Sequence, residues 1–129
     1  MVQVKVYGLV DQLNPIKSKL SNLIHTSMIE VLQISQEKRF QRFISLDKSD
    51  FYYPTDRSQN YLIIEISMFD GRSVETKKQL IRRLFQQINE QLQISVDDIE
   101  ITIFEIPKSN WGIRGLPGDE LALNYKVQV

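Results

Sequence analysis

Arg72 occupies a position in the sequence that suits anion binding. It stands one residue before Ser73, at the start of an expected helix. The first backbone amides of a helix carry partial positive charge, so they and the guanidinium of Arg72 can converge on one anion. A guanidinium also matches the two oxygens of a carboxylate with parallel hydrogen bonds. Arg72 therefore indicates a carboxylate site, with a solvated arginine at a strand end as the alternative interpretation.

Other residues that could carry chemistry are few. Glu37, Lys38 and Arg39 form a charged turn ahead of an expected strand, and we interpret it as solvated. The single histidine, His25, falls on the apolar stripe of its helix, so we expect a core or interface residue. With one histidine and no cysteine, the sequence predicts no metal site, and the absence of a nucleotide-binding glycine motif predicts no cofactor.

The bulk composition is typical of one globular domain. The 129 residues suit a single core, 42% of them are hydrophobic, and 16 basic side chains balance 16 acidic ones. This balance gives no electrostatic reason to expect nucleic acid or an anionic membrane as partner. No window is long and apolar enough for a membrane helix, and the start at Met1 does not resemble a signal peptide, so we expect a cytoplasmic protein.

The sequence repeats itself at an offset of 60 positions without a gap. Leu32–Ser35 matches Leu92–Ser95 residue by residue, and Lys48-Ser49 matches Lys108-Ser109. Because these identities keep the phase of the apolar pattern, they favour an internal duplication over chance. We predict one domain over residues 1–129, with repeats at 1–49 and 61–109 and a tail at 110–129.

Each repeat has the pattern of a strand, a helix and a strand. Alternation from Val2 and apolar residues from Tyr61 to Met68 predict the opening strands, and apolar steps of three and four predict two amphipathic helices. Right-handed crossovers should place both helices on one face of a four-stranded α/β (α+β) sheet. Its open face would then favour self-association. The remaining expectations are closing strands at 39–46 and 99–106, a last short strand at 121–129, and a solvated Arg82-Arg83 pair.

Several of these features together resemble the tautomerase superfamily, the group of 4-oxalocrotonate tautomerase, macrophage migration inhibitory factor and malonate semialdehyde decarboxylase. They are the duplicated β-α-β order and the strand beginning at Val2. The segments Asn110–Gly115, Arg39–Gln41 and Gly71–Ser73 are most similar to the malonate semialdehyde decarboxylase branch. The resemblance implies a homotrimer with active sites near the subunit boundaries.

The resemblance also implies roles for single residues. The family uses the amine of an N-terminal proline as its base, whereas this chain has Met1 followed by Val2, so the α-amine of one of these residues would take that role. An acidic residue, here Glu37, would polarise water or a carbonyl. Arg72, helped by Arg39 or Arg114, would bind the substrate carboxylate, and Trp111 would form an apolar wall.

Three functions follow as hypotheses. The first is keto–enol tautomerisation or decarboxylation of a small oxo-carboxylic acid. The second is a small-molecule-binding trimer of the same fold that has lost catalysis, which the absence of proline at position 2 favours. The third is an oligomeric regulatory protein of ferredoxin-like topology, which also contains two β-α-β units.

Overall fold

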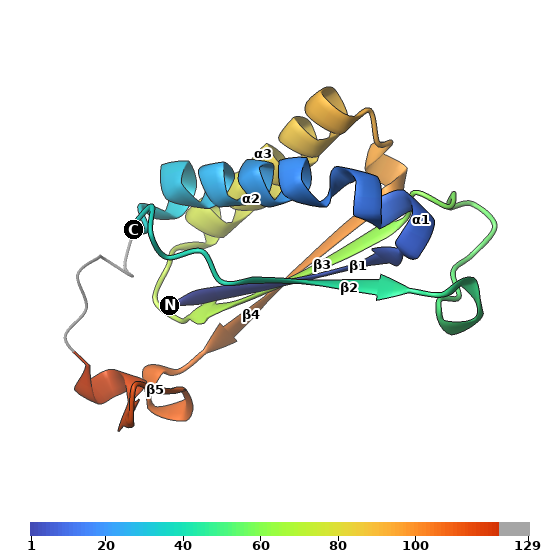
Figure 1. Cartoon of the computed structure of the whole chain (residues 1–129). Helices are drawn as coiled ribbons and strands as arrows, with labels where there is room; N and C mark the ends of the chain where they lie inside the picture. Colours follow the sequence, from blue (N-terminus) through green and yellow to red (C-terminus); the bar gives the residue numbers. More distant parts are fainter. Residues whose placement is uncertain (122–129) are drawn as a thin grey trace.

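The computed structural model describes residues 1–121 and has a four-stranded sheet as its centre. The strands are β1 (Val2–Leu9), β2 (Gln41–Leu46), β3 (Leu62–Phe69) and β4 (Ile99–Ile106). They lie in the order β2-β1-β3-β4, with β1 and β3 antiparallel and each outer strand parallel to its neighbour (Figure 1). β4 is confirmed as predicted, whereas β2 begins at Gln41 instead of Arg39. The strand expected at 121–129 lies, beyond Leu121, outside the described residues.

The helices cover one face of this sheet, as predicted (Figure 1). The first crossover is divided into α1 (Val10–Leu13), the 3-10 turn Asn14–Ile16 and α2 (Lys17–Leu32), and the second is the single helix α3 (Val74–Leu92). Pro15 lies in the 3-10 turn, where a missing amide is tolerated. α2 and α3 end at glutamines in the left-handed conformation, Gln33 and Gln93, which are 60 residues apart.

The duplication is present in the structure as well as in the sequence. β1 and β3 correspond residue for residue at the offset of 60, and so do the 3-10 turns Lys48–Asp50 and Lys108–Asn110. The second repeat adds one more turn, Val96–Asp98, before β4. Each strand of one repeat therefore has a counterpart in the other, and the two repeats place equivalent residues at opposite ends of the sheet because β1 and β3 are antiparallel.

The core lies between the helices and the inner strands, while the other sheet face is mixed. Fully buried residues on the helix side include Val6, Ile64, Ile66, Leu20, Ile24, Leu80, Leu84 and Ile88. The opposite face carries polar side chains such as Lys5 and Glu65, whose charged groups lie 4.0 Å apart, beside exposed Phe104. The expectation of self-association was based on an apolar open face, and this face also carries charged side chains. No helix within residues 1–121 has the length and apolar character needed to cross a membrane.

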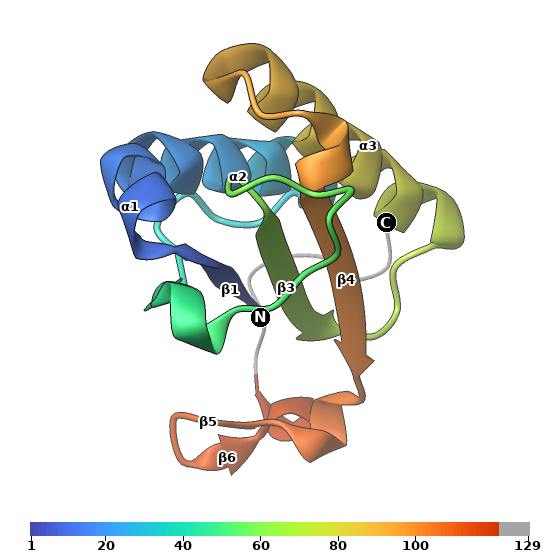
Figure 2. The ribbon, with the colours of Figure 1, turned by 90° about the vertical axis from the view of Figure 1, so that its right-hand side faces the viewer.

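The chain after β4 forms a small hairpin unit beyond the end of the sheet (Figure 2). β5 (Gly112–Ile113) pairs with β6 (Leu116–Pro117), and a 3-10 turn, Gly118–Glu120, follows. Gly118 is buried, and its amide donates a 2.7 Å hydrogen bond to the carbonyl of Trp111. A β-carbon on Gly118 would lie 2.6 Å from the Lys108 carbonyl oxygen, so the hairpin unit closes tightly on the residues that follow β4.

Candidate active site

Three chain segments meet at one end of the strands, called the sheet edge below, because of the sheet topology. β1 starts where β3 and β4 end: the Phe69 amide donates to the Met1 carbonyl over 3.4 Å, and the Asp70 amide donates to the Ile106 carbonyl over 3.0 Å. Lys108 follows two residues beyond Ile106. The α-amine of Met1 is therefore placed beside the loop from β3 to α3 and the turn after β4.

Arg72 is held in this edge by a sharp turn. Gly71 has a φ of 125°, a conformation that side chains disfavour, and Ser73 caps α3 by accepting the Thr76 amide over 3.1 Å. Between them Arg72 is directed inward and is only 4% exposed. Local backbone geometry, set by a glycine and a helix cap, thus buries a cation that would otherwise be solvated.

The buried guanidinium of Arg72 lacks sufficient partners. Its Nη1 donates a long 3.4 Å hydrogen bond to the Phe69 carbonyl, while Nε and Nη2 are buried without a partner among the described residues. Burial lowers the pKa of Arg72, and the charge of Glu105 opposes that shift. Glu105 is itself engaged, with Lys77 Nζ 2.5 Å from its carboxylate. Buried donors without acceptors are costly, so this arrangement suits the binding of an anion.

The α-amine of Met1 is strongly perturbed in the same place. Burial, followed by the positive charges of Arg72 and Lys108, lowers its pKa from 8.0 to about 5. At neutral pH the amine is therefore mostly a neutral base with a free lone pair. A neutral amine beside a buried guanidinium provides a base or nucleophile next to an anion site, and both are needed for chemistry on an oxo acid.

Aromatic side chains form the wall behind these groups. The rings of Phe69 and Trp111 pack edge to face with their centroids 5.2 Å apart. Phe69 is fully buried and Trp111 is half-buried. An apolar wall strengthens charge interactions at its surface because it excludes water. Trp111 therefore lies beside Phe69, and its role as a wall of the site stays a prediction.

The structure brings together only part of the predicted set within one chain. Met1, Arg72 and Trp111 lie at the edge described above, and Val2 is buried as the first residue of β1. Lys108 belongs to the same group and was missed by the sequence analysis. The repeated Lys-Ser pair was a signal for it, but only the strand pairing shows that its second copy lies beside Met1.

The other predicted residues are directed elsewhere in the single chain. Glu37 is exposed and accepts a hydrogen bond from the Ser35 hydroxyl, which lowers the pKa of its carboxyl. Arg39 Nη1 donates to Asn22 Oδ1 over 2.7 Å and so turns toward α2. Arg114, with a φ of 51°, lies in the turn of the β5–β6 hairpin and is exposed.

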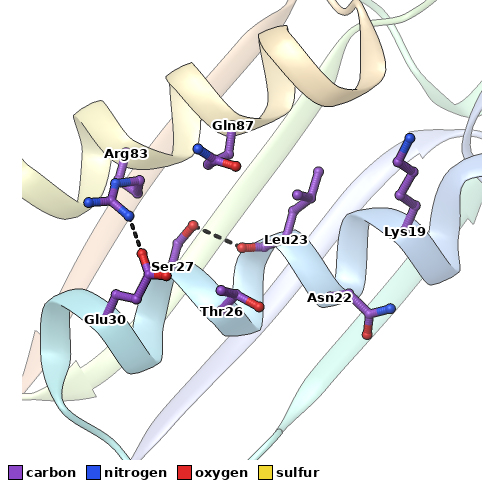
Figure 3. Close-up of a pocket in the computed structure, with 8 residues that line it drawn as sticks. All are labelled: Lys19, Asn22, Leu23, Thr26, Ser27, Glu30, Arg83 and Gln87. Atoms are coloured by element: carbon purple, nitrogen blue, oxygen red, sulfur yellow. Dashed lines mark hydrogen bonds and ion pairs between the residues drawn. The ribbon is translucent and has the colours of Figure 1, made fainter.

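The groove between α2 and α3 is a separate depression with little unsatisfied chemistry (Figure 3). Its Arg83 pairs with Glu30 across the two helices, and the Ser27 hydroxyl donates to the Leu23 carbonyl over 2.8 Å. The predicted solvated face is present, since the side chains of Arg82 and Arg83 are 68% and 39% exposed, and Arg83 in addition pairs with Glu30. The buried His25 has its Nε2 2.7 Å from the Gln36 carbonyl, which agrees with its predicted place in the core.

Comparison with solved structures shows which known proteins share this fold. The fold matches that of malonate semialdehyde decarboxylase with a TM-score of 0.79 at 18% identity, covering 92% of this chain and 99% of that one. It also matches an asymmetric trimer of fused 4-OT with a TM-score of 0.80 at 18% identity, covering 91% and 96% of the two chains. These matches show that the chain has the fold of both proteins.

Sequence comparison identifies the family. The profile of the family described as tautomerase enzyme matches residues 38–114, more than half of the chain, and the chain therefore belongs to that family. A probable tautomerase, YusQ of Bacillus subtilis (strain 168), is 29% identical over 98 residues, covering 72% of this chain and 77% of that protein. The 2-hydroxymuconate tautomerase of Pseudomonas fluorescens is 34% identical over 59 residues, covering 46% and 94%. The family match favours this fold over the ferredoxin-like alternative.

Proposed function

We propose that this protein catalyses proton transfer between carbon and oxygen in a small oxo acid, with the α-amine of residue 1 as base and Arg72 as the carboxylate-binding group. The observation that carries the proposal is the buried guanidinium of Arg72, which has two N–H groups without partners beside an amine of pKa about 5. Membership in the tautomerase family supports it.

The proposed reaction follows from the groups at the sheet edge. The substrate carboxylate binds to the free N–H groups of Arg72, and this contact places the carbon next to the carbonyl near the amine of Met1. The neutral amine removes a proton from that carbon, and the electron pair of the C–H bond moves onto the carbonyl oxygen to give an enolate. The positive charge of Lys108 stabilises the developing negative charge, and the ammonium group then returns its proton to the oxygen.

The resemblance to a decarboxylase suggests a related reaction. Loss of carbon dioxide from a 3-oxo acid produces the same kind of enolate, so the same cations would stabilise it. The solved structure with this fold is named malonate semialdehyde decarboxylase, and several relatives are named 2-hydroxymuconate tautomerases. Small oxo or hydroxy acids are therefore the substrate class to test first.

We also propose that the protein is a homotrimer of a single domain spanning residues 1–129. Solved structures of fused 4-OT with this fold are described as trimers. In such an assembly the exposed Arg39 and Arg114 could reach the site of a neighbouring copy, where they could supply the second carboxylate contact, and Glu37 could act there as well. Light scattering that shows a monomer at micromolar concentration would remove this part of the proposal.

The proposed function is tested by following the keto–enol conversion of phenylpyruvate by ultraviolet absorbance. The comparison is between Arg72→Gln and the control Arg82→Gln, since Arg82 is exposed on α3 and pairs only with Glu75 at 3.6 Å among the described residues. We expect Arg72→Gln to lower kcat/KM by about 100-fold, because truncating one partner of a buried charge pair typically costs several kcal/mol. Arg82→Gln should retain the wild-type rate.

The same experiment separates the active enzyme from the inactive binding protein. If wild-type protein converts phenylpyruvate no faster than buffer, the catalytic proposal is wrong. Calorimetric titration with pyruvate then decides whether the site still binds an oxo acid. Stoichiometric binding that Arg72→Gln removes would identify a small-molecule-binding protein of this fold.

A further inference from the structure

The amine at the sheet edge differs chemically from that of a proline. In a chain whose first residue is Met1, or Val2 after removal of the methionine, the terminal amine is primary. A primary amine condenses with a carbonyl compound, loses water and gives an imine that is stable without a permanent charge. A secondary amine gives only a charged iminium or an enamine. The residues at positions 1 and 2 therefore allow a covalent reaction that goes beyond proton transfer.

The surroundings of the amine favour this reaction. Met1 is partly buried next to Phe69, to whose amide its carbonyl is hydrogen-bonded, so the amine is anchored at one position. Arg72, with two free buried N–H groups, can hold the carboxylate of an oxo acid and so bring its carbonyl carbon to the amine. Glu105, which lies near Arg72, is already paired with Lys77. Among the described residues, no carboxylate is hydrogen-bonded to the guanidinium of Arg72.

We propose that the primary α-amine of residue 1 is a nucleophile that forms an imine with a small 2-oxo acid whose carboxylate is bound by Arg72. This inference rests on the proposed site but assigns it a second activity. It requires no cofactor and no oxidant or reductant, because condensation and hydrolysis are both redox-neutral.

The reaction is a condensation that forms an imine and releases water, followed by hydrolysis of that imine. The amine lone pair attacks the carbonyl carbon, an N–C bond forms, and the π electrons of the C=O bond move onto oxygen. One proton then passes from nitrogen to that oxygen to give a neutral carbinolamine, and the second nitrogen proton leaves later with the oxygen as water. The C–O bond then breaks, the oxygen leaves as water with a second proton, and a C=N bond remains. Water adds to this bond in the reverse sequence, and the amine and the oxo acid are released. The carbonyl oxygen thereby exchanges with the oxygen of water.

The test is reductive trapping of the imine. Protein with the printed sequence is incubated with pyruvate and sodium cyanoborohydride near neutral pH, and intact mass and peptide mapping follow the adduct. We expect one reduced adduct per chain on the N-terminal peptide, formed faster than labelling of any lysine. Acetone, which has a carbonyl but no carboxylate, should label that peptide at least about tenfold more slowly, because it cannot use the contact with Arg72.

Variants assign the adduct to its residue and its binding group. Lys108→Arg keeps the charge and removes the nearby lysine amine, so the adduct should persist in that variant. Arg72→Gln should lower the ratio of pyruvate labelling to acetone labelling about tenfold or more, whereas Arg82→Gln should leave that ratio unchanged. Absence of an N-terminal adduct, an adduct that maps to Lys108, or a blocked terminal amine in the intact mass would each overturn the proposal.

This test fails separately from the test of the proposed function. Exchange of the substrate C–H hydrogens with deuterium from the solvent reports proton transfer, while the trapped adduct reports nucleophilic attack. If exchange occurs without an adduct, the amine is a base only and the imine is excluded. If the adduct forms without exchange, the nucleophile is established and the tautomerase proposal fails.

Discussion

The two ends of the sheet have the same backbone and different chemistry. The offset of 60 residues makes each position at the open end, where Met1 lies, equivalent to one at the closed end, where the linker between the repeats lies. The equivalent pairs are Met1 and Tyr61, Phe69 and Leu9, Arg72 and Gln12, Lys108 and Lys48, and Trp111 and Phe51. The closed end therefore shows what this architecture does when the position equivalent to Arg72 is a glutamine, Gln12.

The closed end is filled by aromatic rings, and its charged groups are largely paired. Arg57 lies 2.9 Å from Asp56 and 3.2 Å from Glu100, and only its Nε is buried without a partner among the described residues. Phe51 stacks on Tyr61 with ring centroids 5.6 Å apart, and Tyr53 meets the ring of Phe51 edge to face at 5.5 Å. Burial, together with a hydrogen bond to Glu100, raises the pKa of Tyr61 to about 12. The three rings pack against one another, and such packing is typical of a structural cluster.

The open end keeps its polar groups unsatisfied. Arg72 is buried with two unpartnered N–H groups, and the amine of Met1 loses its proton at a pH where an ordinary α-amine retains it. Groups kept in such a state usually lower stability and are found where binding or catalysis requires them. The comparison teaches that the duplicated fold supplies two ends with similar backbones, and that the side chains leave polar groups unpaired at one end and pack aromatic rings at the other.

The largest expected effect comes from removing an aromatic ring of the closed end. Phe51 is 8% exposed, so Phe51→Ala should lower the free energy of unfolding by about 3 kcal/mol through the cavity it creates. Tyr52→Ala is the matched control, since Tyr52 is 89% exposed and should change the value by less than about 0.5 kcal/mol. Urea unfolding measures both. Loss of activity in folded Phe51→Ala protein would contradict the separation of the two ends.

At the open end, a small added group should have the next largest effect. In Gly118→Ala the new methyl group would meet the Lys108 carbonyl at 2.6 Å and the ring of Phe69 at 2.9 Å, so we expect a loss of about 2 kcal/mol from overpacking. Gly112→Ala is the control, because a β-carbon there meets nothing within 4 Å. Unfolding followed by Trp111 fluorescence measures the difference. Equal stability of the two variants would show that the hairpin unit does not pack on the site.

The sequence was sufficient for the fold because the fold depends on periodic patterns. Alternation predicted the strands, helical spacing predicted the helices, and the offset of 60 residues predicted that the chain contains two equivalent repeats. Arg72 could be found because its place before a helix cap is a local signal. Lys108 could not, because its relation to Met1 depends on three strands that are distant in sequence.

Side-chain direction was the other feature that the sequence did not reveal. Arg39 begins near the sheet edge and yet turns to Asn22 of α2, and Arg83 finds Glu30 on the facing helix. Long charged side chains reach partners on several sides, and tertiary packing decides between them. The depressed pKa of the Met1 amine is likewise a product of burial, which no local pattern records.

A smaller effect of opposite sign is expected when the unsatisfied charge is removed. Arg72→Met replaces a buried cation that lacks partners with an apolar side chain of similar length, so the free energy of unfolding should rise by about 1 kcal/mol while activity is lost. Arg57 at the closed end is the counterpart: its guanidinium lies 2.9 Å from Asp56, 3.2 Å from Glu100 and over the ring of Tyr61. Arg57→Met should therefore not stabilise the protein. Destabilisation by Arg72→Met would show that Arg72 is a structural residue.

The titration of the terminal amine predicts how stability and rate change with pH, and the sign follows from the folded and unfolded states of the chain. The folded amine has a pKa of about 5 and the unfolded amine one of 8.0, so between these values the unfolded chain binds a proton that the folded chain does not. This group therefore makes the folded state more stable as pH rises from 5 to 8, and the gain disappears as pH falls through that window. The rate of carbon–hydrogen exchange should rise with pH up to about 5 and then level off, because the neutral amine is the base.

Lys108→Gln tests how much of this shift depends on charge. Burial and Arg72 both lower the pKa of the amine more than Lys108 does. The variant should therefore shift the lower limb of the pH–rate profile to higher pH by only a small amount. Lys48→Gln, the equivalent change at the closed end, should leave the limb in place. The profile of deuterium exchange against pH measures both variants. If Lys48→Gln shifts the limb as much as Lys108→Gln does, the effect is one of overall charge, and the distinction between the two ends loses its electrostatic part.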